Sequence, residues 1–262
     1  MVAARRPLMA GNWKMNLDHL QSIAHVQKVA WTLKDAKHDY EAVEVAVFPP
    51  FTDLRSVQTL VEADKLPIAY GGQDCSEHDS GAHTGDVSAA FLAALGCRYV
   101  IIGHSERRAD HGEGDELLGR KVQAALKHGL VPVLCVGETA EDLERHGASA
   151  IPVAQLKAAL EGVAKDAELV IAYEPVWAIG SGQAATAEQA QTVCRALRDT
   201  LRELHGDEQA DRTRILYGGS VKSDNIAGFM REPDVDGALI GGASLKSDEF
   251  TAIARYQQHV GA

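Results

Sequence analysis

Short apolar runs recur along the whole chain, and each is followed by a turn signal and then by a stretch with apolar residues three to four positions apart. Short continuous apolar runs favour buried strands, whereas the 3.6-residue periodicity of stretches such as 117–128 and 187–204 favours helices. The candidate strands are 8–12, 43–48, 68–73, 99–103, 131–136, 169–173, 215–218 and 238–241.

Eight strands that alternate with helices predict a parallel sheet, because parallel neighbours need a crossover connection. The strands are nearly continuous in apolar character, as in 99–102, which is typical of a sheet whose outer face is covered by helices. An open doubly wound sheet and a closed barrel both fit this pattern. No Pro/Ser-rich linker divides the sequence, so we expect one α/β domain over residues 1–262.

Polar and glycine residues cluster just after the strand ends. In a closed barrel all these positions surround one mouth, whereas in an open sheet they are spread along an edge. The pattern therefore favours a single-domain (β/α)8 barrel of eight parallel strands with outer helices. The residues concerned are Asn12, Lys14, Gln73, Asp74, His104, Ser105, Glu106, Gly137, Glu138, Glu174, Gly219, Ser220, Gly241 and Gly242.

The formal net charge is −11, from 26 basic and 37 acidic residues, and no basic tract of the kind that binds nucleic acid is present. No apolar run approaches the roughly 18 residues of a membrane span, and no apolar segment follows the N-terminal arginines. We therefore expect a cytoplasmic protein without nucleic-acid or membrane partners. The four widely spaced cysteines are expected to be reduced, and the acidic stretch 110–116 is expected to be a solvated helix start and not a metal site.

Four segments carry a resemblance to a known family. They are 10–16 (AGNWKMN), 103–108 (GHSERR), 172–180 (AYEPVWAIG) and 217–220 (YGGS). Their order and spacing resemble the signature segments of the triosephosphate isomerase family, from about residue 7 to the last helix. The resemblance implies interconversion of dihydroxyacetone phosphate and glyceraldehyde 3-phosphate through an enediolate, in glycolysis and gluconeogenesis, by a homodimer with no cofactor and no metal.

Glu174 and His104 are the central catalytic candidates. Glu174 ends an apolar strand and precedes Pro175, so its carboxylate is expected to be partly desolvated and a stronger base. From position alone, a structural glutamate paired with an arginine is equally compatible; the resemblance implies the catalytic base. His104 precedes a predicted helix start, which disfavours a charged imidazole, and the resemblance implies that it donates a hydrogen bond to the substrate oxygens.

Asn12 and Lys14 leave the first strand two residues apart, a spacing that puts both side chains on one side if the backbone stays extended. A lone lysine is more often a surface residue, but Lys14 lies within a matched segment, which implies that it faces the phosphate and the developing enediolate. By the same resemblance Glu106 is the acid beside the histidine and the lysine.

The phosphate site is expected at the loops after the last two strands, where barrels often bind phosphate through backbone amides. Gly241 and Gly242 precede a likely short helix at 243–245, and Ser220 follows the preceding strand. Two ordinary turns would also explain these glycines. Residues 176–185, including the expected substrate contact Gly180, resemble the family's mobile lid, and Thr186 begins a capping-box signal behind it.

The lid also matches G-x-G-x-x-A, the dinucleotide fingerprint, at 180–185. Six residues separate these glycines from the preceding strand, and the next strand does not end in an acidic residue, so the match is only weak support for a nucleotide site. The loop 73–88 resembles one that enters a partner subunit, although Gly72 and Asp74 stand where alanine and asparagine are common in the family. A different phosphate-binding barrel enzyme and a scaffold without turnover remain as alternatives.

Overall fold

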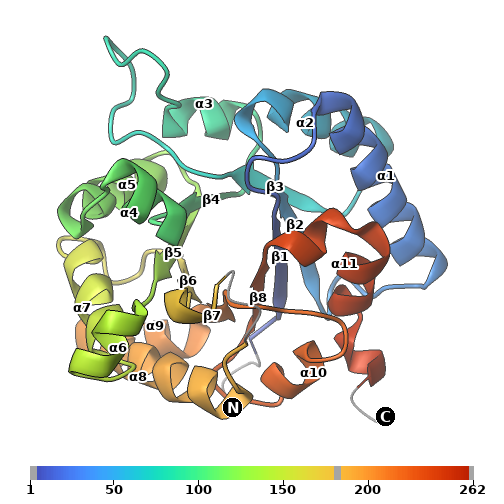
Figure 1. Cartoon of the computed structure of the whole chain (residues 1–262). Coiled ribbons are helices and arrows are strands. Elements are labelled where there is room, and N and C mark those ends of the chain that lie inside the picture. Colours follow the sequence, from blue (N-terminus) through green and yellow to red (C-terminus); the bar gives the residue numbers. More distant parts are fainter. Residues whose placement is uncertain (1–4, 180–183, 260–262) are drawn as a thin grey trace.

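The computed structural model describes residues 5–179 and 184–259. Eight parallel strands pair in sequence order, and β8 pairs with β1, so that the sheet closes into a barrel (Figure 1). This confirms the barrel and rules out the open sheet, and every predicted strand boundary lies within one residue of the observed one. The strands are β1 (Leu8–Asn12), β2 (Glu44–Phe48), β3 (Ala69–Gly72), β4 (Tyr99–Ile102), β5 (Val131–Val136), β6 (Val170–Tyr173), β7 (Arg214–Tyr217) and β8 (Gly237–Ile240).

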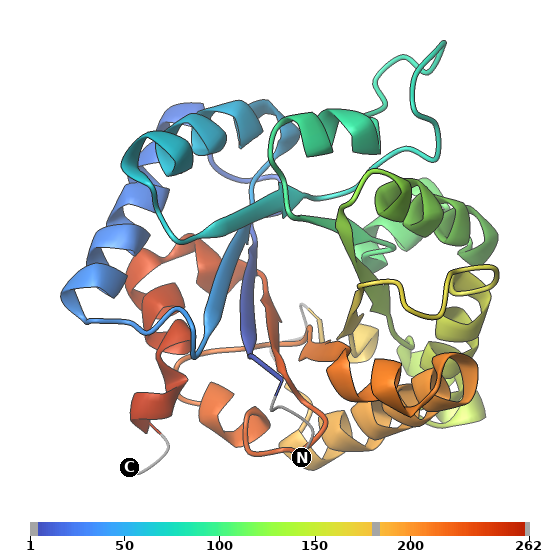
Figure 2. The same cartoon turned by 180° about the vertical axis from the view of Figure 1, so that it is seen from behind.

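Helices surround the barrel on all sides, as the views from both ends show (Figures 1 and 2). Within the described residues, no helix is long and apolar enough to cross a membrane. The α-helices are α1 (His19–Asp35), α2 (Leu54–Asp64), α3 (Ala89–Ala94), α4 (Ser105–His111), α5 (Asp115–Lys127), α6 (Ala140–His146), α7 (Ala150–Ala159), α8 (Ala187–His205), α9 (Asp207–Arg212), α10 (Ile226–Phe229) and α11 (Ser247–Ala254). Short 3-10 helices lie at η1 (Phe51–Asp53), η2 (Val176–Ala178), η3 (Gly242–Leu245) and η4 (Tyr256–His259).

Alternate strand residues belong to two separate apolar clusters. One contains strand residues such as Leu8, Phe48 and Tyr99 and fills the barrel. The other combines the intervening strand residues with apolar residues of the helices, for example Ile171 with Leu197. Because successive side chains of a strand point to opposite faces, the continuous apolar runs of the sequence supply both layers.

Closure between β8 and β1 depends on a glycine. Gly237 pairs with Leu8 and has a φ of 143°, a left-handed conformation that residues with a side chain avoid. A Cβ at Gly237 would lie 2.0 Å from the Leu8 carbonyl oxygen. The last strand can therefore approach the first only where this side chain is absent.

The four cysteines are free and buried, as the sequence predicted. The predicted helix start within 110–116 is confirmed, because α5 begins at Asp115 and most of this stretch is exposed, but Glu113 departs from the predicted solvation. Glu113 is only 6% exposed and lies 2.7 Å from the Lys121 ammonium. Local composition indicated a polar surface, but the tertiary fold buries this carboxylate against a lysine.

Candidate active site

Glu174 follows β6 at the mouth of the barrel and is 2% exposed. Its amide donates a 2.8 Å hydrogen bond to the carbonyl of Val136 on β5. Gly137 lies so close that a Cβ there would come within 1.8 Å of the Glu174 carbonyl oxygen. The backbone that carries this carboxylate is therefore fixed by the neighbouring strand.

The Glu174 carboxylate bridges two groups at the start of α4. Oε1 lies 3.0 Å from Nε2 of His104, and Oε2 accepts a 2.9 Å hydrogen bond from the Ser105 amide. Burial alone would raise the pKa of Glu174, but His104, the Ser105 amide and Lys14 outweigh it, and the pKa is lowered. The carboxylate is therefore ionised at neutral pH although it is buried, as a base must be.

His104 is the N-cap of α4, and its Nδ1 accepts a hydrogen bond from the Glu106 amide at 3.2 Å. In the neutral imidazole the proton therefore lies on Nε2, which faces Glu174. Burial lowers the pKa of His104, but the Glu174 carboxylate raises it by more. The contact with Glu174 thus opposes the neutral imidazole expected from the sequence.

Lys14 reaches the site by a turn and not by an extended strand. Strand β1 ends at Asn12, and Lys14 has a φ of 53°, in the left-handed region. The Asn12 side chain accepts a 3.0 Å hydrogen bond from the Lys14 amide, and Gln73 donates to the Lys14 carbonyl at 2.7 Å. The predicted extended spacing is therefore wrong, although the turn still places the Lys14 ammonium 2.5 Å from Glu106.

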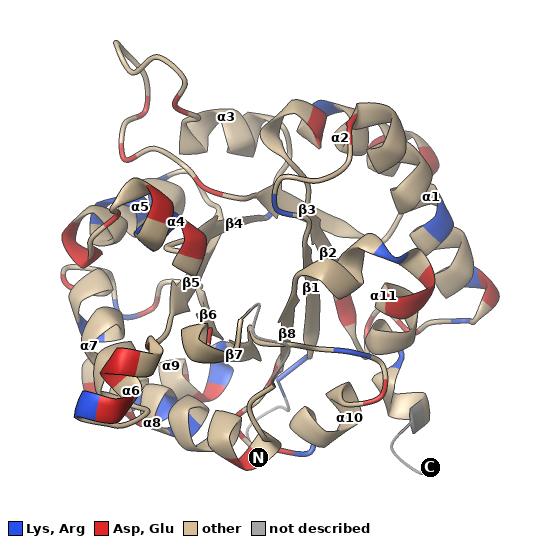
Figure 3. Ribbon diagram, viewed as in Figure 1, with Lys and Arg blue, Asp and Glu red and all other residues tan. Residues whose placement is uncertain are grey.

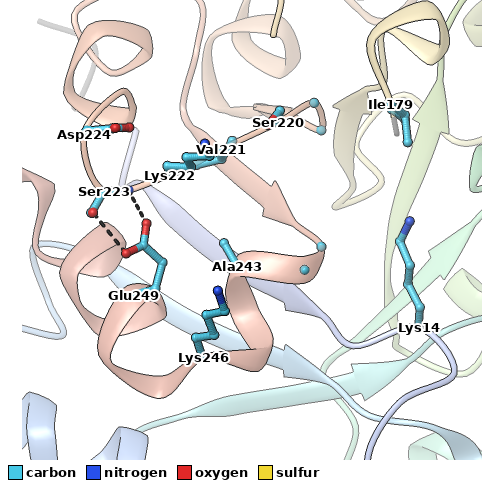
Figure 4. A pocket seen from close by; sticks show the side chains of 14 residues that line it. Lys14, Ile179, Ser220, Val221, Lys222, Ser223, Asp224, Ala243, Lys246 and Glu249 are labelled. Atoms are coloured by element: carbon cyan, nitrogen blue, oxygen red, sulfur yellow. Dashed lines mark hydrogen bonds between the residues drawn. The ribbon is translucent and has the colours of Figure 1, made fainter. Parts of the chain in front are cut away.

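The residues expected to bind phosphate follow the last two strands, β7 and β8. Ser220 follows β7, and Gly241 and Gly242 follow β8, where η3 forms the predicted short helix. Together with Lys14 these residues line a cavity of about 590 Å³ (Figure 4). No atom lies within 4 Å of a Cβ built on Gly242, so the space beside its backbone is open.

Acidic residues are distributed over the outer helices, including α4, α6 and α11 (Figure 3). With a net charge of −11, the protein as a whole opposes an anionic ligand. The cavity is lined by Lys14, Lys222 and Lys246, and Lys222 and Lys246 make no ion pair with any residue in the described ranges. Asp224 and Glu249 also line the cavity, so its wall has three basic and two acidic side chains, in contrast to the excess of acidic residues over the whole chain.

Lys14 joins this cavity to a second hollow of about 490 Å³, which is also lined by Asn12, His104 and Glu106. The predicted phosphate-binding residues and the predicted catalytic residues therefore line adjacent cavities that share Lys14. Glu174 is buried and contacts His104. Gly180 lies outside the described residues.

Two contacts of the site were missed from the sequence. The Ser105 amide donates a hydrogen bond to Glu174. Every residue but proline has a backbone amide, so the sequence predicted only the helix start at this position and not the hydrogen bond. Gln73 donates to the carbonyls of Lys14 and Phe48, at 2.7 and 2.9 Å. Its place at a strand end was noted, but nothing in the sequence indicated these partners.

Comparisons with known proteins agree with this geometry. The family described as triosephosphate isomerase matches residues 7–257. A protein of Leifsonia xyli subsp. xyli named triosephosphate isomerase is 73% identical over 98% of this chain and 99% of its own length. Two further proteins of the same name are similar. The one from Streptomyces avermitilis is 58% identical over 98% of this chain and 99% of its own length. The one from Mycobacterium ulcerans is 54% identical over 96% of this chain and 96% of its own length. The chain therefore belongs to the triosephosphate isomerase family and is an isomerase built on the (β/α)8 barrel.

Proposed function

We propose that the chain interconverts dihydroxyacetone phosphate and glyceraldehyde 3-phosphate by proton transfer through an enediolate, without a cofactor. The observation that carries this proposal is the ionised, buried Glu174 beside His104 at the mouth of the barrel. A carboxylate in this state can take a proton from carbon only if it is desolvated and close to groups that stabilise the product anion.

In the proposed reaction Glu174 leaves the Ser105 amide and removes a proton from the carbon next to the substrate carbonyl. The same carboxyl returns a proton to the other carbon, so that the net change is the exchange of a carbonyl and a hydroxyl. His104 gives its Nε2 proton to the former carbonyl oxygen and takes back the proton of the former hydroxyl, so that the proton on oxygen is also transferred. Asn12 and Lys14 stabilise the negative oxygen of the enediolate. Glu106, 2.5 Å from the Lys14 ammonium, orients that cation.

The substrate phosphate is assigned to the cavity beside Ser220, Gly241 and Gly242, with Gly180 as a further contact. Backbone amides bind phosphate well where no side chain intervenes, and the open space at Gly242 supports this assignment. Exclusion of water by the segment 176–185 would protect the enediolate from losing its phosphate.

A coupled assay that starts from glyceraldehyde 3-phosphate tests the proposal. We expect turnover that a metal chelator does not diminish, since no step assigned here uses a metal. An aldolase or synthase would require a second substrate or a Schiff-base lysine, and a scaffold would give no turnover. Loss of activity in chelator that one divalent ion restores would overturn the mechanism.

We further propose a cytoplasmic homodimer with a role in glycolysis and gluconeogenesis, each chain forming one domain over residues 1–262. The loop 73–88 projects away from the barrel between β3 and α3 (Figures 1 and 2). Met15 is 95% exposed at the hollow beside Lys14, which supports docking of a partner's loop there. Sedimentation should give a dimer with isologous contacts, and a fully active monomer at nanomolar concentration would contradict it.

A further inference from the structure

His25 is a residue of α1 and lines neither of the two cavities. It contacts residues that lie next to the site in the sequence, Ser244 and Trp13. Its Nε2 is 2.8 Å from the carbonyl oxygen of Ser244 in η3. Because a carbonyl only accepts, Nε2 must carry a proton and donate it. Burial, with a smaller effect of Lys28, lowers the pKa of His25 in spite of this bond, so the imidazole is a neutral donor at physiological pH.

Ser244 is fully buried and connects His25 to the loop after β8, where the phosphate is assigned. The amide and the hydroxyl of Ser244 both donate to the Gly241 carbonyl, at 2.8 and 2.7 Å. Ser244 therefore links His25 to Gly241, which lines the cavity together with Gly242.

The same imidazole also contacts the segment that carries Lys14. The rings of His25 and Trp13 meet edge to face, with centroids 5.2 Å apart and an interplanar angle of 83°. Trp13 is fully buried between Asn12 and Lys14 in the sequence. One side chain of the outer helical layer thus contacts both segments that would face the two ends of the substrate.

We propose that His25 is a positioning residue for the phosphate side of the site. Its hydrogen bond to Ser244 holds η3 so that the Gly241 and Gly242 amides face the phosphate, and its contact with Trp13 sets this turn relative to Lys14. The inference rests on the proposed function for the place of the phosphate. It assigns no contact between His25 and the substrate.

The test compares His25→Leu with a matched histidine elsewhere. His38 also donates from Nε2 to a backbone carbonyl, that of Val43 at 2.9 Å, and also meets an aromatic ring edge to face, that of Tyr40 at 4.7 Å. Burial lowers its pKa as well. His38 lies ahead of β2, away from the mouth, so His38→Leu removes the same kind of contact without touching the site.

In His25→Leu we expect the KM for glyceraldehyde 3-phosphate and the dissociation constant of inorganic phosphate, measured by calorimetry, to rise together by about fivefold. The kcat should fall by less than KM rises. His25→Gln should recover most of the phosphate affinity, because its amide can donate in place of Nε2. His38→Leu should lower the melting temperature but leave KM and phosphate binding unchanged.

Equal phosphate affinity in His25→Leu and the wild type would overturn the proposal, as would a loss that His25→Gln does not recover or that His38→Leu shares. The calorimetric measurement does not require turnover. A wild-type protein that binds phosphate without isomerising glyceraldehyde 3-phosphate would therefore contradict the proposed function while leaving the positioning role open to the same comparison.

Discussion

Two buried glutamates at neighbouring strand ends behave in opposite ways. Glu138 follows β5 and is fully buried, and Glu174 follows β6 and is 2% exposed. Burial raises the pKa of Glu138, and the hydrogen bonds from Trp177 and Tyr173 do not offset it, whereas the pKa of Glu174 is lowered because His104, the Ser105 amide and Lys14 outweigh burial.

The difference lies in the charge of the partners. Oε1 of Glu138 accepts from the Tyr173 hydroxyl at 2.9 Å and from the Trp177 indole at 2.7 Å, and its Oε2 has no partner among the described residues. Neutral donors support a carboxylate less than charged ones do. Similarly low exposure therefore accompanies a raised pKa at one carboxyl and a lowered pKa at the other.

The largest expected effect separates the two by activity. Glu174→Gln keeps the size and most hydrogen bonds but removes the proton acceptor, so kcat should fall by about 10²–10⁴, as is typical for a general base. The affinity for a phosphorylated substrate analogue should change much less. Steady-state kinetics on the folded variant would check this, and near-normal turnover would remove Glu174 from the mechanism.

The next effect concerns stability, and the two glutamates should give slopes of opposite sign. The lowered pKa of Glu174 stabilises the fold above the carboxyl's ordinary value of 4.5, and this contribution is lost as the pH falls below it. The raised pKa of Glu138 gives a contribution that is full below 4.5 and is lost as the pH rises through the raised value.

Melting temperatures across pH 3 to 8 would measure these slopes. The advantage of the wild type over Glu174→Gln should grow as the pH rises through the acid range, and its advantage over Glu138→Gln should shrink as the pH rises further. Parallel slopes for the two variants would show that the partners do not distinguish the carboxyls.

The smallest effect sharpens the role of the neutral donors. Tyr173→Phe removes only the hydroxyl that donates to Glu138, so it should cost about 1–3 kcal/mol of unfolding free energy at pH 7. The cost should decrease at acid pH, where Glu138 is protonated and relies less on this donor. Chemical denaturation at both pH values would test this. A pH-independent cost would indicate simple loss of packing.

The strand boundaries of the barrel could be predicted closely because they depend on local sequence patterns. Apolar runs and turn signals define each strand within one residue, and the parallel arrangement follows from the alternation with helices. The same holds for α4 and η3, whose starts at Ser105 and Gly242 were anticipated near strand ends.

What could not be predicted depends on contacts between distant segments. Glu113 is in a polar stretch, yet Lys121 and the fold bury it. The 3.0 Å contact of Glu174 with His104 joins residues 70 positions apart and raises the histidine's pKa, which the helix start alone would lower. Side-chain partners of this kind follow from the closed barrel and not from any single motif.

The left-handed backbone of Lys14 has a consequence for protein engineering. A residue with a Cβ in this conformation costs about 1–2 kcal/mol, which glycine avoids. A search for heat-resistant variants would therefore favour glycine at this position and discard the cation that the proposed chemistry requires. Selection for thermal stability and selection for catalytic rate therefore oppose each other at Lys14. Stabilising substitutions should be sought at other positions.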